Sequence, residues 1–260
     1  MLINVIILSI VEGITEFLPV SSTGHLIIVS EWLKMDKTFA ATFDVAIQLG
    51  AIIAVLFLFP NYFKEFLNPQ KIISERSKII VVAIFPALLL GFFFRDMIKQ
   101  YLFTSETVFV ALIIGGIALI AADLAFKKRT IDHTDNKESV TLKQAIIIGL
   151  FQCAALWPGM SRSGSTIIGG LVAGANVTTA ASFSFIIAVP VMVAAVGYDL
   201  LKSYHELSLN QMGWVLVGMI LSFMVAYASM RWFLGFIQKQ GLYLFGIYRI
   251  ILGGAGLFIF

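Results

Sequence analysis

Two carboxylates, a serine pair and a histidine lie close together near the start of the chain, in the segment EGITEFLPVSSTGHL at residues 12–26. The residues around this segment are almost all apolar. An ionisable side chain at membrane depth is costly, so such a group usually marks a reaction site or a permeation path. We therefore take this segment as the first candidate for a functional site.

Glu12 and Glu16 are four residues apart, so on a helix they share one face, with Cβ atoms about 5–6 Å apart. Two carboxylates this close in a low dielectric need neutralisation. Either one is protonated, or Arg249 or Arg162 pairs with them for purely structural reasons, or they hold a divalent cation. Mg²⁺ and Ca²⁺ prefer oxygen ligands, and Mg²⁺ normally completes its shell with water and substrate phosphate. We expect Glu12 and Glu16 to hold a divalent cation, Mg²⁺ or Ca²⁺, as cofactor.

The hydroxyl groups of this segment are candidate nucleophiles, and His25 follows Ser22 by three residues. On a helix this spacing brings the imidazole near the hydroxyl, where it could act as base or acid. A lone histidine among small residues is more often a packing or hydrogen-bonding residue, so the hypothesis depends on its neighbours. We predict that Ser22 and His25 are catalytic.

A second polar segment, PGMSRSGST at residues 158–166, repeats the arrangement and adds Arg162. Backbone N–H groups at the start of a helix, together with the helix dipole, favour an anion, and the planar guanidinium suits bidentate phosphate binding. Serine- and glycine-rich helix starts also occur for capping alone, but two of them beside an arginine and a glutamate pair form a stronger pattern. Gln48 shares a helix face with Asp44 and could line the same cavity. We predict a phosphate site with Arg162 as a catalytic residue and the binding residues Ser21, Thr23, Gly24, Gln48, Ser161, Ser163 and Gly164.

The two polar segments align with each other without a gap, residues 11–25 over residues 151–165. The aligned pairs include Glu12 with Gln152, Ser21 with Ser161, Ser22 with Arg162, and Gly24 with Gly164. Residues 43–51 fall over residues 183–191 at the same offset. The pattern indicates a duplication within one membrane domain, 1–260, with repeats at about 1–126 and 141–260.

The composition indicates a membrane protein. Apolar residues make up 59% of the chain and charged residues 13%, with a mean hydropathy of +0.95, whereas about 25% of the residues of a soluble domain are charged. The net charge of +3 is small, which argues against a nucleic-acid partner. The single cysteine excludes an intramolecular disulfide.

The hydrophobic pattern predicts an all-α polytopic membrane protein. A spanning helix needs about 20 mostly apolar residues, and six stretches qualify: 43–60, 78–95, 106–126, 181–201, 212–233 and 242–260. Two further segments, 1–30 and 143–175, are interrupted by Pro, Gly and Ser. Non-helical backbone at membrane depth is tolerated only where protein shields it or where it lines a wet cavity. We read each as a re-entrant helical hairpin, with tips near 19–24 and 158–164; the alternative is a single span kinked at its proline.

Counting crossings predicts an inverted repeat. A re-entrant hairpin crosses nothing and three spans follow it, so the second half enters from the opposite face. Loops on one side hold eleven basic residues: Lys64, Lys71, Arg76, Lys78, Lys127, Lys128, Arg129, Lys137, Lys143, Arg231 and Lys239. The other side holds five: Lys34, Lys37, Arg95, Lys99 and Lys202. Because basic loops favour the cytoplasm, we expect both termini and the open side of the first hairpin to face outward.

The segments EGITEFLPVSSTGHL and PGMSRSGST, in this order and at this separation, resemble the undecaprenyl-diphosphate phosphatase family (the BacA/UppP type, associated with bacitracin resistance). FDVAIQLGA at residues 43–51 falls where the family has a similar segment. The resemblance implies a hydrolase that converts undecaprenyl diphosphate to the monophosphate and phosphate, which recycles the lipid carrier for cell-wall synthesis. It implies Glu12, Glu16, Ser22, His25 and Arg162 as the catalytic residues.

The resemblance also implies a location and partners. It places the chain in the bacterial cytoplasmic (inner) membrane, surrounded by lipid, with a polyprenyl diphosphate as substrate. The orientation expected from the basic loops makes the active site face outward. A homodimer is one alternative for the oligomeric state. Ser22 either attacks the terminal phosphorus or positions a water, and both routes stay open.

A transporter is the rival hypothesis. Broken helices that meet at mid-membrane in an inverted repeat are also a transporter architecture, and a polyprenyl-phosphate flippase would use the same anion site. Moving a lipid phosphate requires no nucleophile and no base. Ser22, His25 and the glutamate pair therefore favour the phosphatase.

Overall fold

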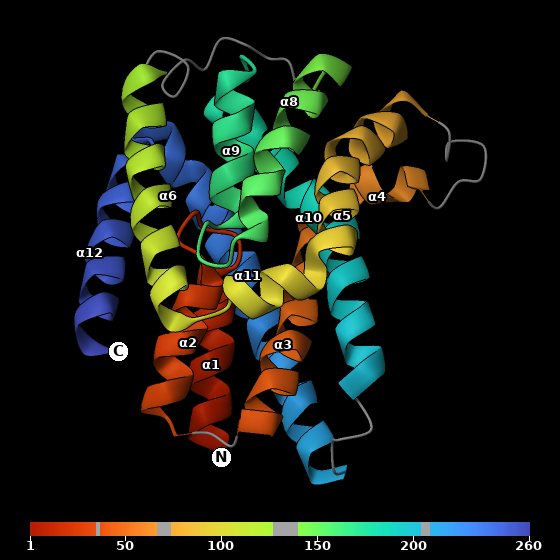
Figure 1. Cartoon of the computed structure of the whole chain (residues 1–260). Coiled ribbons are helices and arrows are strands. Elements are labelled where there is room, and N and C mark those ends of the chain that lie inside the picture. Colours follow the sequence, from red (N-terminus) through yellow and green to blue (C-terminus); the bar gives the residue numbers. More distant parts are fainter. Residues whose placement is uncertain (35–36, 67–73, 127–139, 204–208) are drawn as a thin grey trace.

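The computed structural model describes residues 1–34, 37–66, 74–126, 140–203 and 209–260, and within these ranges all regular structure is helical (Figure 1). The elements are α1 (Leu2–Thr15), α2 (Ser22–Trp32), α3 (Lys37–Leu58), α4 (Pro60–Phe66), α5 (Glu75–Tyr101), α6 (Ser105–Ala125), α8 (Leu142–Gln152), the 3₁₀ turn η2 (Cys153–Leu156), α9 (Arg162–Val172), α10 (Val177–Ser203), α11 (Leu209–Gln240) and α12 (Tyr243–Ile259).

All six predicted spans coincide with helices, namely α3, α5, α6, α10, α11 and α12. Among the described residues, five of these helices are long and apolar enough to cross a membrane. The sixth, α12, is apolar but has 17 residues, slightly fewer than the roughly 20 that a perpendicular span requires. The prediction of an all-α polytopic membrane protein is confirmed.

Both interrupted segments fold back on themselves. Helix α1 ends at Thr15 and α2 begins at Ser22, and α1 packs beside α2. In the same way α8 and η2 pack beside α9, which begins at Arg162. The alternative of a single span kinked at a proline is therefore wrong in both places. We call the two connecting segments the first tip (residues 16–21) and the second tip (residues 157–161).

The two hairpins enter the molecule from opposite ends. In Figure 1, α1 and α2 rise from the lower end, α8 and α9 descend from the upper end, and their tips meet near the centre. Both chain termini lie in the lower half of this view. The inverted relation of the repeats and the orientation in the membrane stay predictions. Of the basic residues used for the orientation, Lys71, Lys127, Lys128, Arg129 and Lys137 lie outside the described residues.

Threonine side chains cap the starts of α6 and α8. The Thr104 side chain accepts a hydrogen bond from the Thr107 N–H at the start of α6. Thr141 and Gln144 form a capping box at the start of α8, which satisfies backbone N–H groups that the helix itself leaves without partners. Trp157 Nε1 donates to the Thr107 carbonyl oxygen at 3.2 Å. The second tip is thereby attached to the start of α6.

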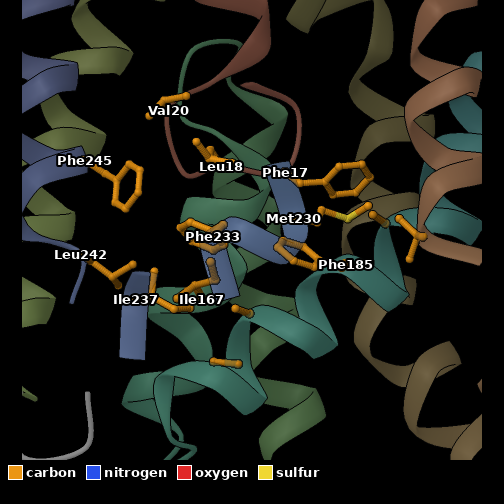
Figure 2. Packing of buried hydrophobic residues seen from close by; sticks show 14 of the residues in the cluster. Phe17, Leu18, Val20, Ile167, Phe185, Met230, Phe233, Ile237, Leu242 and Phe245 are labelled. Atoms are coloured by element: carbon orange, nitrogen blue, oxygen red, sulfur yellow. The ribbon is translucent and has the colours of Figure 1, made fainter. Parts of the chain in front are cut away.

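Helices of the two halves are interleaved. Helix α11 packs on α1 and α3, α12 packs along α6, and α10 contacts both α9 and α3. The main apolar cluster accordingly places Phe17, Leu18 and Val20 of the first tip among second-half residues of α9 to α12 (Figure 2). Phe17 meets Phe185 edge to face, with ring centroids 5.3 Å apart. Burial of these side chains holds the polar first tip inside the protein.

The close contact between α3 and α11 gives a testable prediction. A Cβ atom added at Gly50 would overlap the Met219 carbonyl oxygen of α11, a backbone atom that cannot rotate away. We expect Gly50→Ala to lower the free energy of unfolding by about 1–3 kcal/mol, because overpacking displaces helices. Gly235→Ala on α11 is the matched control, since nothing lies within 4 Å of its added Cβ, and it should be neutral or stabilise by roughly 0.5–1 kcal/mol. Thermal unfolding in detergent measures both; equal melting of the two variants would contradict the described packing.

Candidate active site

The two tips end in the same backbone conformation. Ser21 has φ 69° and ψ 100°, and Ser161 has φ 68° and ψ 116°. In the described part of the chain only one other non-glycine residue, Lys34, has a positive φ. Residues other than glycine rarely adopt this conformation, and Ser21 and Ser161 are an aligned pair in the sequence. The matching strain therefore marks the point where each half-helix begins.

The two helix starts differ in how they are capped. Ser161 Oγ accepts the Gly164 N–H at 3.2 Å and lies 3.0 Å from Ser163 Oγ, and Ser163 Oγ donates to the Leu18 carbonyl oxygen at 2.8 Å. Ser21 makes no side-chain cap at the start of α2. The α9 start is thus satisfied by its own serines, whereas the α2 start is the more open of the two to an external anion.

Glu16 of the first tip is hydrogen-bonded to the first residues of both α9 and α2. Its Oε1 accepts a hydrogen bond from Arg162 Nη2 at 2.9 Å, and its Oε2 accepts the Ser22 hydroxyl at 2.5 Å. The Glu16 and Arg162 side chains are 9% and 12% exposed, so this ion pair is shielded from water. A carboxylate at this distance orients the Ser22 hydroxyl and can accept its proton.

Glu12 has no such partner. Its side chain is fully buried, and neither carboxylate oxygen accepts a hydrogen bond from any donor among the described residues. The charged groups that interact with it are Glu16, Asp44 and Arg162. A buried carboxylate without a partner is costly. The three carboxylates Glu12, Glu16 and Asp44 thus face a single guanidinium, and either protonation or a bound cation would offset the excess of negative charge.

Arg162 is held on three sides by the protein. Besides Glu16, its guanidinium donates to the Ser184 carbonyl oxygen at 3.1 Å and lies 5.4 Å from the centre of the Phe17 ring. Part of the structural alternative considered for the carboxylates is thus present, because Arg162 neutralises Glu16. The planar fork bridges the first tip and α10, a geometry that lysine cannot reproduce.

His25 lies at the same helix start but is directed away from Ser22. Its Nδ1 is 2.7 Å from the Ser21 carbonyl oxygen, and its Nε2 is 2.6 Å from the Tyr248 hydroxyl on α12. The Ser22 hydroxyl donates to Glu16, and no hydrogen bond joins it to His25 in the described part of the chain. Helical spacing places the two residues on one face of α2, but it does not rank the competing acceptors of the serine hydroxyl.

Comparison with known proteins identifies the family. The family model described as "Bacitracin resistance protein BacA" matches residues 5–255. The chain belongs to this family. The Undecaprenyl-diphosphatase of Bacillus subtilis (strain 168) is 46% identical over 260 residues, covering 95% of this chain and 94% of that protein. The Undecaprenyl-diphosphatase of Clostridium tetani (strain Massachusetts / E88) is 44% identical over 260 residues, covering 97% and 94%. Undecaprenyl-diphosphatase 2 of Bacillus licheniformis is 46% identical over 265 residues, covering 97% and 95%.

Of the remaining predicted site residues of this BacA-family chain, Thr23 and Gly24 lie in the first turn of α2 and Gln48 lies on α3. Gly24 is buried, and a Cβ there would come within 2.8 Å of Leu112. Thr23 is half-buried in the first turn of α2. Gln48 is half-buried on α3, and no hydrogen bond links it to the other site residues that the structure describes. Asp44, four residues earlier, has a buried carboxylate oxygen without a partner.

Arg249 makes a different kind of interaction from the one considered for it in the sequence. Pairing with the glutamates was one alternative, but among the described residues its fully buried guanidinium bonds only to carbonyl oxygens. Nη1 donates to Pro19 of the first tip at 3.2 Å, and Nη2 donates to Gly159 of the second tip at 2.8 Å. Two further bonds go to α6, at Ala111 and Leu112. Pro19 and Gly159 are aligned residues of the two repeats, so one side chain fastens equivalent points of both tips.

One sequence signal could have indicated this contact. An arginine inside an apolar span needs several acceptors, and glycines on a neighbouring span provide the space. A Cβ at Gly115 of α6 would overlap the Arg249 guanidinium. The contact between Tyr248 and His25 had no comparable signal, because the two residues are 223 positions apart.

The Arg249 contacts predict a large effect of a charge-conserving substitution. Arg249→Lys keeps the cation, but an ammonium cannot reach carbonyls on three sides. Each buried carbonyl left without a donor costs about 1–3 kcal/mol, so we expect the melting temperature and the activity to fall together. Arg231→Lys, an exposed position on α11, is the control and should change stability by less than about 0.5 kcal/mol. Thermal unfolding in detergent tests both, and wild-type melting of Arg249→Lys would refute the assigned contacts.

Proposed function

We infer that this chain is an undecaprenyl-diphosphatase, which hydrolyses undecaprenyl diphosphate to undecaprenyl phosphate and inorganic phosphate and so recycles the lipid carrier for cell-wall synthesis. Membership of the BacA family and relatives of that name over nearly the whole chain support this inference. The single observation that carries it on this chain is the Ser22 hydroxyl bound to half-buried Glu16 at an uncapped helix start.

The chemistry assigned to each tip follows from its contacts. Ser22 would attack the terminal phosphorus or hold the attacking water, with Glu16 accepting the proton. Backbone N–H groups at the α2 start, with Ser21, Thr23 and Gly24, would bind the phosphate oxygens. Phosphoryl transfer depends chiefly on positioning and on stabilising charge. Fixed dipoles and a fixed carboxylate at a buried helix start provide both.

The second tip would act mainly by support. Ser161 and Ser163 already bond to one another, to the Gly164 N–H and to the Leu18 carbonyl. Arg162 would hold the Glu16 side chain in place next to Ser22, and its remaining N–H groups would face the substrate charge. We accordingly place Ser161, Ser163 and Gly164 as residues that shape the phosphate site.

A divalent cation fits the first hairpin. Glu12 supplies two carboxylate oxygens without partners, and Mg²⁺ is commonly held by one or two carboxylates with water and substrate phosphate. In the described part of the chain no three metal-ligating side chains are grouped, so Glu12 and Glu16 would be the protein ligands. When bound, Mg²⁺ or Ca²⁺ would offset the charge of the diphosphate.

The transporter hypothesis is less well supported. A flippase would need an anion site but not a serine oriented by a carboxylate. The relatives that match nearly the whole chain carry the name of a diphosphatase. The phosphatase is therefore the better account of the first tip.

We expect purified protein in detergent to release phosphate from a long-chain prenyl diphosphate. Ser22→Ala should lower the rate by more than about 10²-fold if Ser22 is the nucleophile, and by less if it positions water. Ser9→Ala is the matched control, because its hydroxyl bonds the Val5 carbonyl within α1.

Excess EDTA should abolish turnover and added Mg²⁺ or Ca²⁺ should restore it. Absence of phosphate release would overturn the function, and full activity in EDTA would overturn the cation alone.

We further propose that the chain lies in the bacterial cytoplasmic (inner) membrane with the first hairpin open to the outside; a homodimer stays a prediction. Exposed Glu31 ends the first hairpin and exposed Glu75 begins α5 at the opposite end of the molecule. In a Cys153→Ala background, Glu31→Cys should react with an impermeant thiol reagent on intact cells, and Glu75→Cys should react only after lysis. The reverse labelling pattern would invert the orientation.

A further inference from the structure

The hydrogen-bond partners of His25 define its tautomer. Nδ1 lies 2.7 Å from the Ser21 carbonyl oxygen, and Nε2 lies 2.6 Å from the Tyr248 hydroxyl. A carbonyl oxygen can only accept, so Nδ1 carries the proton. In the neutral ring, Nε2 then has a lone pair that accepts the Tyr248 O–H.

Ser22 does not compete for this lone pair. Its hydroxyl donates to Glu16 Oε2 at 2.5 Å, so the serine proton is directed toward the carboxylate. The basic nitrogen of His25 is directed toward α12. The two catalytic candidates in the first turn of α2, Ser22 and His25, therefore belong to two separate hydrogen-bonded pairs.

We propose that Tyr248 is a positioning residue for the phosphatase reaction, whose hydroxyl fixes the His25 ring with Nε2 turned to α12. This inference rests on the proposed phosphatase function and on the catalytic role that the sequence predicts for His25, through which Tyr248 acts. Nothing in the sequence motifs assigns a role to Tyr248, since it lies more than two hundred residues from His25.

Packing makes the Tyr248 hydroxyl a fixed support. The His25 and Tyr248 rings are stacked, with centroids 5.6 Å apart and an interplanar angle of 13°. Tyr248 directly precedes Arg249, which is bonded to both tips. Helix α12 carries both residues, so the bond from Arg249 to the first tip also sets the position of the Tyr248 hydroxyl relative to that tip.

The pair also connects the buried site with the protein surface. His25 is 9% exposed, whereas Tyr248 is 44% exposed. No other side chain among the described residues hydrogen-bonds a ring nitrogen of His25. Substitution of the hydroxyl alone therefore isolates this contact, because phenylalanine can keep the stacked ring.

The first test is spectroscopic and independent of turnover. With His133→Gln and His205→Gln, His25 is the only histidine of the chain, and ¹⁵N-histidine labelling reports its two nitrogens in detergent. We expect a protonated Nδ1 and an unprotonated, hydrogen-bonded Nε2. In Tyr248→Phe the Nε2 resonance should move toward the value of a lone pair without a hydrogen bond. A protonated Nε2, or an unchanged resonance in the variant, would overturn the proposal.

The second test is a double-mutant cycle on phosphate release. Loss of one oriented hydrogen bond should lower kcat about 2- to 12-fold, with KM nearly unchanged. Tyr248→Phe should have no further effect in a His25→Gln background, because the two residues act as one unit. Tyr243→Phe, on the same helix and 42% exposed, is the matched control and should match the wild type.

The outcomes separate this inference from the function on which it rests. Additive effects of the two substitutions, with wild-type melting of both variants, would show that Tyr248 does not act through His25 and would overturn it. Full activity of His25→Gln would remove the catalytic role of His25 and the inference with it. In that case phosphate release by the wild type would still support the phosphatase.

Discussion

The central constraint of this structure is one buried cation that binds carbonyls from both tips. A guanidinium inside a membrane protein is tolerated only if its N–H groups are satisfied, and Arg249 satisfies them with backbone oxygens at Pro19, Gly159 and α6. The Pro19 and Gly159 carbonyls belong to the irregular chain of the two tips, which has no helical donors of its own. The guanidinium and the carbonyl groups thus give each other the hydrogen-bond partners that burial removes. These bonds hold the two tips against each other at the candidate site.

Other contacts across the tips depend on that alignment. The Arg162–Glu16 ion pair and the bond from Ser163 to the Leu18 carbonyl both join the first tip to the second hairpin. Breaking one member of a buried ion pair typically costs about 3–5 kcal/mol, so neither tip can shift freely relative to the other. This rigidity favours preorganised stabilisation of charge. It also explains why a strained serine, such as Ser21, is retained at the centre of the protein.

Much of this architecture could be predicted from the sequence, because it follows from hydropathy and from breaks in it. The six spans, the two hairpins and the place of each tip needed only apolar length and the positions of Pro, Gly and Ser. Side-chain partners could not be predicted in the same way. The chain leaves helical geometry between Glu16 and Ser21, so Ser22 meets Glu16 instead of His25. Arg249 and Tyr248 find partners that only the packing of α12 brings near.

The unequal chemistry of the aligned tips has a consequence for exchanging parts of the chain. The second hairpin has Gln152 and Leu156 where the first has Glu12 and Glu16, and only the second has the arginine. Two copies of the first hairpin would bring four glutamates to the tips without a guanidinium, and two copies of the second hairpin would have neither carboxylate. The two hairpins are therefore complementary instead of redundant, and chimaeras between relatives should tolerate exchange of both hairpins together better than exchange of one.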